Sequence, residues 1–187
     1  MQSLCKPSPM SDPTPSIPDF LHPAPEGWQW VVFHSKPRCE KKVESLQRLR
    51  PAKIFLPCIE RIHNYGARKR VNQIPMFTGY VFGMIQKEDR RWFQQNANVA
   101  NILEVVDEAH FLAPLKAIAE ALQSGMNLEV FPDFEPGRKV QITGGAMKGL
   151  EAEVTEIKGK TTVLLRLDMI QQTVAMEIDM AYLKLLA

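Results

Sequence analysis

Cysteine is scarce in this chain of 187 residues, and long apolar runs are missing. The three cysteines, Cys5, Cys39 and Cys58, are odd in number and far apart, which fits neither a disulfide framework nor the ligand spacing of a zinc site. No run approaches the roughly 20 apolar residues that span a membrane, and the N-terminus lacks the apolar stretch of a signal peptide. We therefore expect a soluble, cytoplasmic monomer with no membrane partner.

Patterns that carry catalysis are also missing. The four histidines, His22, His34, His63 and His110, are scattered without a ligand-like spacing, and no Ser/His/Asp or Cys/His arrangement is suggested by their neighbours. No glycine-rich phosphate loop precedes a helix. The sequence thus predicts no catalytic residue, no metal site and no cofactor, and the protein is not expected to be an enzyme.

Basic residues, by contrast, are concentrated in one part of the chain. Residues 36–72 contain eleven Lys and Arg against three Glu, whereas seven basic residues balance seven acidic ones from residue 135 to the end. Clustered Lys and Arg attract polyanions over about a Debye length, roughly 10 Å. The charge distribution therefore predicts that a polyanion meets the first half of the chain.

Proline content and hydrophobic periodicity divide the chain into four parts. Residues 1–26 hold seven of the fourteen prolines and are expected to form a disordered tail. Residues 27–125 alternate strand-like and helical segments in the order β-α-β-β-β-α-β-α, which predicts an α+β domain with one sheet covered on one face by helices. Residues 126–135 are predicted to be a linker, and residues 136–187 a second, small domain.

Glycine-bearing turns between alternating strands mark the second domain. Two β-type runs in residues 136–154 flank Gly144, Gly145 and Gly149, and glycine adopts the positive φ of tight turns at little cost. Residues 161–167 alternate in polarity, so the pattern predicts a small β-barrel in preference to a helical form. Residues 136–154 resemble a KOW motif, with Gly149 at its central glycine. That resemblance implies an SH3-like barrel of the kind found in NusG-type transcription factors and several ribosomal proteins.

Three segments of the first domain together resemble the N-terminal (NGN) domain of the NusG family. They are residues 30–38 (WVVFHSKPR), which lead into a helix at Glu40, residues 54–57 (IFLP) and residues 75–82 (PMFTGYVF). Followed by a linker and a KOW segment, they extend the resemblance over about residues 28–187. It implies an antiparallel NGN sheet with helices that binds the clamp helices of the largest RNA polymerase subunit. It also implies a KOW domain that recruits a ribosomal protein or Rho.

The resemblance assigns roles to two groups of residues. Phe77, Tyr80 and Phe82 match family positions that form an apolar patch for the clamp helices, and the alternative is that they are ordinary sheet core. A second group matches the surface that lies near upstream duplex and non-template DNA; its alternative is a solvated helix face paired with Glu40 or Glu44. The members of this group are Lys36, Arg38, Lys41 and Lys42. For the basic hairpin tip at residues 68–70, contact with polymerase and contact with DNA both remain open.

Departures from the family pattern bear on the type of factor. Residues 146–148 (AMK) replace the bulky aromatic usual before the KOW glycine, and residues 168–170 (DMI) stand where housekeeping members have a Phe-Gly pair. These departures favour a specialised paralogue of the RfaH type that suppresses pausing or termination. The alternatives are a housekeeping NusG that links polymerase to Rho or the ribosome, and a ribosome- or RNA-associated KOW protein. We expect the second domain to move independently unless an apolar interface holds it.

Overall fold

The computed structural model describes residues 18–65, 68–126, 128–132, 138–145, 147–157 and 160–186. It is an α+β structure built from antiparallel sheets with few helices, so the predicted fold class is confirmed. Three sheets are present in this part of the chain, one in each domain and one in a separate hairpin. No helix in the described ranges is long and apolar enough to cross a membrane.

A four-stranded antiparallel sheet forms the N-terminal domain. Its strand order is β2-β5-β1-β6, and the central strand β1 pairs with β5 from Trp28↔Gln86 to His34↔Tyr80. The strands are β1 (Trp28–Ser35), β2 (Ala52–Phe55), β5 (Tyr80–Gln86) and β6 (Val99–Glu104). The helical segments are α1 (Glu40–Glu44), η1 (Ser45–Arg48), η2 (Lys87–Asp89), α2 (Arg90–Gln94) and α3 (Glu108–Gln123).

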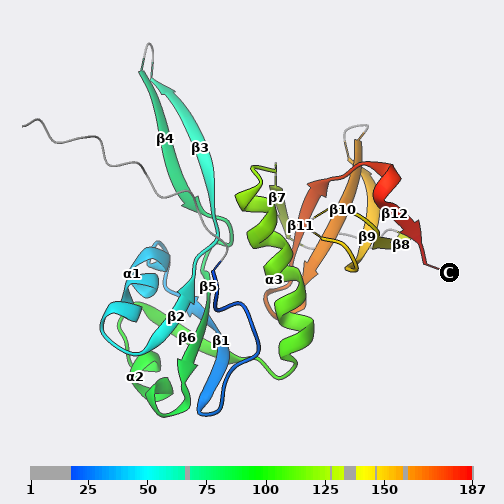
Figure 1. Ribbon diagram of the computed structural model, residues 1–187. Helices are drawn as coiled ribbons and strands as arrows, with labels where there is room; N and C mark the ends of the chain where they lie inside the picture. The colour runs from blue at the N-terminus through cyan, green and yellow to red at the C-terminus, as the bar shows by residue number, and fades with distance from the viewer. Residues whose placement is uncertain are drawn as a thin grey trace, which may run out of the picture.

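Helices cover both faces of this sheet, whereas the sequence predicted cover on one face. Val31 and Phe33 of β1 belong to a buried cluster with Val43 of α1 and Phe93 of α2. The intervening Val32 belongs to the other cluster, which contains the buried residues of α3. Successive strand residues point to opposite faces, and both sets of β1 positions are apolar. Both faces therefore need a covering layer, and α3 supplies the second one (Figure 1).

The remaining strands of the N-terminal domain form a hairpin that projects away from it. β3 (Cys58–Tyr65) and β4 (Arg68–Pro75) make a separate two-stranded sheet, paired from Cys58↔Pro75 to Tyr65↔Arg68. Figure 1 shows this hairpin extending well beyond the four-stranded sheet.

The C-terminal domain is a six-stranded antiparallel sheet in the order β12-β8-β9-β10-β11-β7. Alternate residues of β10 and β11, such as Val163, Leu165 and Val174, are buried in one core, which is consistent with an SH3-like barrel. The segments are β7 (Leu128–Pro132), β8 (Arg138–Ile142), β9 (Glu151–Ile157), β10 (Lys160–Leu167), η3 (Asp168–Ile170), β11 (Gln172–Glu177), η4 (Met180–Tyr182) and β12 (Leu183–Leu185).

Part of the segment predicted to be a linker (126–135) belongs to this sheet instead. β7 pairs with β11 from Leu128↔Met176 to Pro132↔Gln172. Leu128 is buried and Val130, two residues on, packs against the same core, so this short segment has the alternation of a strand. Residues 133–135 lie outside the described part of the chain.

Part of the tail predicted to be disordered (1–26) also packs on the N-terminal domain. Leu21 is buried, the ring of Phe20 stacks on Trp30 with centroids 6.1 Å apart, and the indole Nε1 of Trp30 donates to the His22 carbonyl at 2.9 Å. The backbone N–H of Ala24 donates to a carboxylate oxygen of Glu108 at 2.8 Å. The apolar residues between the prolines therefore order residues 18–26, and residues 1–17 lie outside the described residues.

One apolar cluster runs through both domains. It contains Phe111, Leu115 and Ile118 of α3 together with Leu165 and Ile170 of the C-terminal domain. Figure 1 shows α3 lying between the N-terminal sheet and the C-terminal sheet. The two domains thus share an apolar interface. Independent motion of the second domain was expected only without such an interface.

Candidate functional site

The three predicted aromatic residues lie around the start of β5, on the sheet face that α3 covers. Phe77 and Phe82 are fully buried, at 0% exposure, and their rings meet edge to face with centroids 5.5 Å apart. The ring of Phe82 also packs against that of Phe111 in α3, with the ring centroids 5.9 Å apart. Tyr80 is half-buried. Of the three, only Tyr80 therefore offers surface to a partner in this arrangement.

Tyr80 is stacked on a residue that the sequence did not single out. The exposed ring of His34 lies parallel to it, with centroids 5.2 Å apart and an interplanar angle of 18°. The two residues are direct partners across β1 and β5. No local pattern could have revealed this pair, because they are 46 positions apart in the sequence and only the strand register joins them.

The turn before Tyr80 is held by a buried carboxylate. Gly79 has φ +84°, a conformation that glycine adopts without steric cost. Its N–H donates to Oε1 of Glu40 at 2.9 Å, and its carbonyl accepts from the N–H of Ser35 at 2.8 Å. Glu40 is only 5% exposed. This carboxylate therefore positions the aromatic turn.

The four predicted nucleic-acid residues are all exposed, in the loop after β1 and in α1. They are Lys36, Arg38, Lys41 and Lys42. Arg38 adopts φ +61°, a left-handed conformation that is uncommon for a residue with a side chain. The Lys41 ammonium donates to the carbonyl of Gln73 in β4 at 2.8 Å, so α1 and the base of the hairpin are joined directly.

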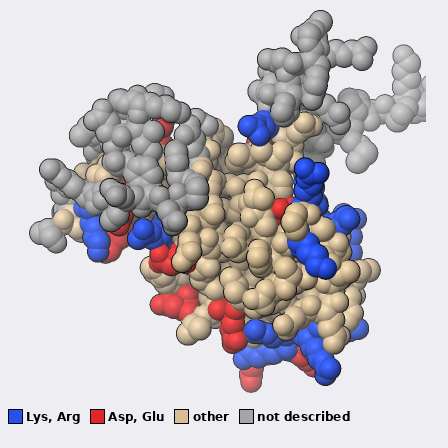
Figure 2. All heavy atoms as spheres, turned by 180° about the vertical axis from the view of Figure 1, so that it is seen from behind, with Lys and Arg blue, Asp and Glu red and all other residues tan. Residues whose placement is uncertain are grey.

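Basic side chains gather near the hairpin base on the face shown in Figure 2, and also at the opposite end of the N-terminal domain. Acidic side chains lie on the side nearer the C-terminal domain, and others are mixed with the basic ones at the opposite end from the hairpin.

Two further side chains near α1 have shifted pKa values. Burial raises the pKa of the Glu44 carboxyl, although nearby Lys41 and Arg48 act in the opposite direction. Burial, followed by the charge of Glu44, raises the pKa of the Cys58 thiol. A protonated thiol is a poor nucleophile, so Cys58 is not an activated cysteine.

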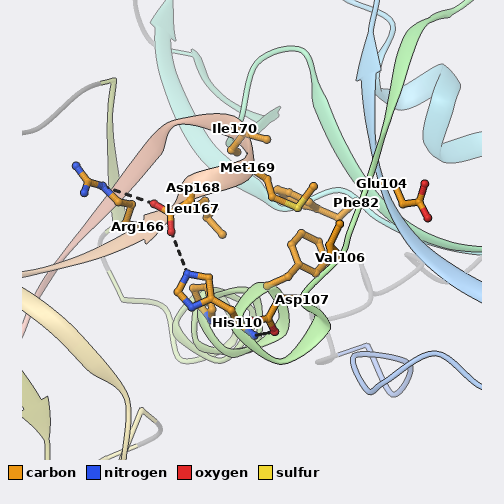
Figure 3. Close-up of a pocket in the computed structure, with 12 residues that line it drawn as sticks. Phe82, Glu104, Val106, Asp107, His110, Arg166, Leu167, Asp168, Met169 and Ile170 are labelled. Atoms are coloured by element: carbon orange, nitrogen blue, oxygen red, sulfur yellow. Dashed lines mark hydrogen bonds and ion pairs between the residues drawn. The ribbon is translucent and has the colours of Figure 1, made fainter.

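A pocket of about 200 Å³ lies between the two domains, beside Phe82. Val106 at its edge is 94% exposed, and Met169 and Ile170 of η3 line it from the C-terminal side. Figure 3 shows His110 of α3 turned toward Asp168 of η3, and the imidazole Nε2 lies 2.9 Å from the carboxylate Oδ2. The C-terminal domain is thus seated against the end of the face that holds Phe82.

The three glycines predicted to belong to a KOW motif, Gly144, Gly145 and Gly149, lie in the loop between β8 and β9. Gly145 and Gly149 have φ +75° and +93°, and the Gly149 N–H donates to the Ile142 carbonyl at 2.7 Å. Gly144 packs against the ring of Tyr182, where a Cβ would overlap it. Gly145 and Gly149 therefore provide the turn conformations, and Gly144 leaves space for the ring of Tyr182. Among the described residues, no group of three or more His, Cys, Asp or Glu is arranged to hold a metal ion.

Comparison with known proteins adds one family match. Residues 28–120 match the NusG family, described as "Transcription termination factor nusG". A solved structure titled "Crystal Structure of MjSpt4:Spt5 complex conformation B" aligns at 18% sequence identity with a TM-score of 0.26, over 84% of this chain and 97% of that chain. No curated protein matches the chain.

Proposed function

We propose that this chain, whose residues 28–120 are a NusG family domain, is a transcription elongation and antitermination factor that binds the clamp helices of RNA polymerase. The family is one of transcription factors, which supports a role in transcription and agrees with the prediction that the protein is not an enzyme. The observation that carries the proposal is the position of Tyr80. It is half-exposed beside an exposed His34, at the rim of the buried Phe77–Phe82 pair.

This arrangement suits an anchor for a helical partner. Aromatic side chains bury much area with few rotatable bonds, and Tyr keeps a polar tip for the rim of an interface. Phe77 and Phe82, which flank the turn at Gly79 in the sequence, are both buried in the present packing. In the proposal, Phe82 reaches the polymerase only after the η3 segment, which lines the same pocket, moves away.

The second part of the proposal concerns nucleic acid. Lys36, Arg38, Lys41 and Lys42 form an exposed basic cluster, and Glu40, which the alternative interpretation would pair with a lysine, is buried and bonds to Gly79 instead. We propose that this cluster lies against upstream duplex or non-template DNA and contacts phosphates. Gly144, Gly145 and Gly149 then belong to a KOW domain that recruits a ribosomal protein or Rho.

The third part concerns the type of factor. The residues at 146–148 and 168–170 depart from the housekeeping pattern, and 168–170 form the η3 turn that is seated against the N-terminal domain. A segment occupied in this way is less available to a second protein. We therefore favour a specialised paralogue over a housekeeping NusG, and both over a ribosome-associated KOW protein.

Binding to purified core RNA polymerase, followed by single-round transcription on a pause-containing template, tests the proposal. We expect the full chain to bind the core enzyme and to shorten pauses. A Tyr182→Ala variant, which removes a half-exposed tyrosine of the C-terminal domain, should bind equally well. Recovery of ribosomal subunits without polymerase from a lysate, together with no effect on pausing, would defeat the proposal.

A further inference from the structure

The pocket between the two domains has the size and the lining of a site for a small organic molecule. Its volume of about 200 Å³ exceeds the roughly 150 Å³ of an apolar cavity that can hold benzene. The rings of Phe82 and Phe111 line it from the N-terminal domain, and Met169 and Ile170 line it from the C-terminal domain. Apolar ligand sites occur preferentially at such domain interfaces. The lining therefore favours an aromatic ring.

An exposed apolar side chain at the edge of this pocket favours the same kind of ligand. Val106 lines the pocket and is 94% exposed, which makes it the most exposed large apolar side chain in the described part of the chain. Its neighbour Val105 is buried. An apolar ligand in the pocket would remove part of the Val106 side chain from water, which is favourable.

Carboxylates predominate among the charged groups that line the pocket (Figure 3). They are Glu104, Asp107 and Asp168, against the guanidinium of Arg166 and the imidazole of His110. Arg166 Nε lies 3.9 Å from a carboxylate oxygen of Asp168. The excess of carboxylates favours a cation over an anion at the mouth of the pocket.

Asp107 is the carboxylate of this group that is best placed to receive the cation. Glu104 already accepts from Nη1 of Arg90 at 3.0 Å, and Asp168 lies 2.9 Å from Nε2 of His110. Oδ1 of Asp107 accepts the backbone N–H of His110 at 3.0 Å. Among the described residues, Asp107 forms no ion pair.

We propose that this pocket binds a small aromatic amine. Its ring lies against Phe82 and Phe111, and its ammonium group pairs with Asp107. Both domains supply walls of the pocket, so the ligand binds the arrangement in which η3 lies against the N-terminal domain. A ligand that binds one arrangement of a protein stabilises it against the others.

The consequence for transcription follows from that preference. In the proposed function, η3 must move away before Phe82 reaches the polymerase, so the amine would reduce polymerase binding. This consequence rests on the proposed function, whereas ligand binding itself does not. The experiment below contains no polymerase, and its failure is therefore distinguishable from a failure of the proposed function.

Amide NMR spectra of the full chain, titrated with three indole compounds, test the inference. Tryptamine carries an ammonium group, indole-3-acetate has nearly the same size but carries a carboxylate, and indole is neutral. The N-terminus of α3 and the guanidinium of Arg166 would favour the anion, so the comparison decides the sign of the ligand charge.

Two variants with matched controls locate the site. Asp107→Asn removes the charge and keeps the helix cap, because Asn caps as well as Asp. Its control is Asp179→Asn, since Asp179 is also exposed and also accepts a backbone N–H at 3.0 Å. Val106→Trp adds bulk at the edge of the pocket, and Leu49→Trp adds it at another exposed apolar position, 68% exposed.

We expect tryptamine to shift the amide signals of residues 106–111 and 166–170 together. Its dissociation constant should be about 1 mM or lower, as for an efficient ligand of about twelve non-hydrogen atoms. Indole-3-acetate should bind roughly threefold more weakly, and Asp107→Asn should weaken tryptamine by a similar factor, since exposed ion pairs contribute this much. Indole should bind the Asp107→Asn variant normally. Val106→Trp should weaken all three compounds, and both controls should bind normally.

Three results would overturn the inference. One is the absence of shifts in both segments at roughly 10 mM tryptamine, a concentration well above the expected dissociation constant. Another is binding of indole-3-acetate as tight as that of tryptamine. The third is an equal effect of Asp107→Asn and Asp179→Asn on tryptamine affinity. The comparison of the three compounds on the unaltered chain needs no variant, so it holds even where a substitution impairs folding.

Discussion

Replacing Tyr80 and Phe82 separately by alanine should separate binding from folding. The two residues lie two apart on β5, yet Tyr80 is half-buried and stacked on His34, whereas Phe82 is fully buried between Phe77 and Phe111. If Tyr80 is the polymerase anchor, its loss should mainly reduce affinity. The loss of Phe82 should mainly reduce stability.

The magnitudes follow from burial. A fully buried aromatic side chain removes about 200 Å² from water, and at about 25 cal/mol per Å² this is worth about 5 kcal/mol as an upper estimate. Phe82→Ala should therefore reduce the free energy of unfolding by about 3–5 kcal/mol. Tyr80 buries about half as much, so Tyr80→Ala should cost at most about 2.5 kcal/mol of stability. It should cost about 2 kcal/mol of polymerase affinity, which is typical of an aromatic hot spot.

Urea unfolding of both variants and biolayer interferometry with immobilised core polymerase provide the two measurements. Tyr182→Ala is the control for loss of a tyrosine, since Tyr182 lies in the C-terminal domain. A Tyr80→Ala protein that is folded and binds polymerase normally would remove Tyr80 from the proposed site. A stability loss as large as that of Phe82→Ala would make Tyr80 a core residue.

Three further substitutions test other parts of the structure. Gly83→Ala should destabilise the fold by about 2 kcal/mol in urea unfolding, because its Cβ would lie 2.8 Å from a ring carbon of the buried Phe33; a neutral result would mean that the ring moves easily. Arg38→Gly should raise the unfolding free energy by about 0.5–1 kcal/mol by relieving the left-handed backbone, and the same assay would contradict this if stability falls. Glu44→Gln should stabilise the protein more at pH 7 than at pH 4, as melting curves at the two pH values would reveal. Because the pKa of Glu44 is raised in the folded protein, the folded state binds more protons than the unfolded state above about pH 4, and the stability that protonated Glu44 contributes is lost as pH rises through the folded pKa. The neutral glutamine avoids this loss at pH 7. An equal gain at both pH values would refute the raised pKa of Glu44.

The local sequence pattern predicted the strands and helices better than it predicted which helices cover each face of the N-terminal sheet. The aromatic and β-branched residues of 28–35 indicate a strand, but cover on only one face of the sheet was predicted, although both sets of alternate positions in this strand are apolar. Which elements supply those layers depends on long-range packing. The family resemblance of residues 28–120 agrees with the family match, whereas the boundary of the tail was too broad because Leu21 packs in the core between prolines.

The site shows the same division. Sequence alone indicated aromatic residues at 77, 80 and 82, but burial separates Tyr80 from the other two. His34 became part of the site only through its register with Tyr80. Glu40 was a candidate partner for Lys41 or Lys42 in the first helix, yet its carboxylate accepts a hydrogen bond from the N–H of Gly79, 39 positions away. Such contacts between distant residues leave no periodic signal in the sequence.

The pairing of β7 with β11 limits how far the two domains can separate. α3 ends at Gln123 and β7 begins at Leu128. The intervening residues span at most about 14–18 Å when fully extended, at up to about 3.6 Å per residue. Unpairing β7 would release its 5 residues and add about 17 Å of reach. Pairing in this strand therefore holds back part of the connection between the domains. Its five residue pairs must open, in addition to the shared apolar interface, before the C-terminal domain can reach a distant partner.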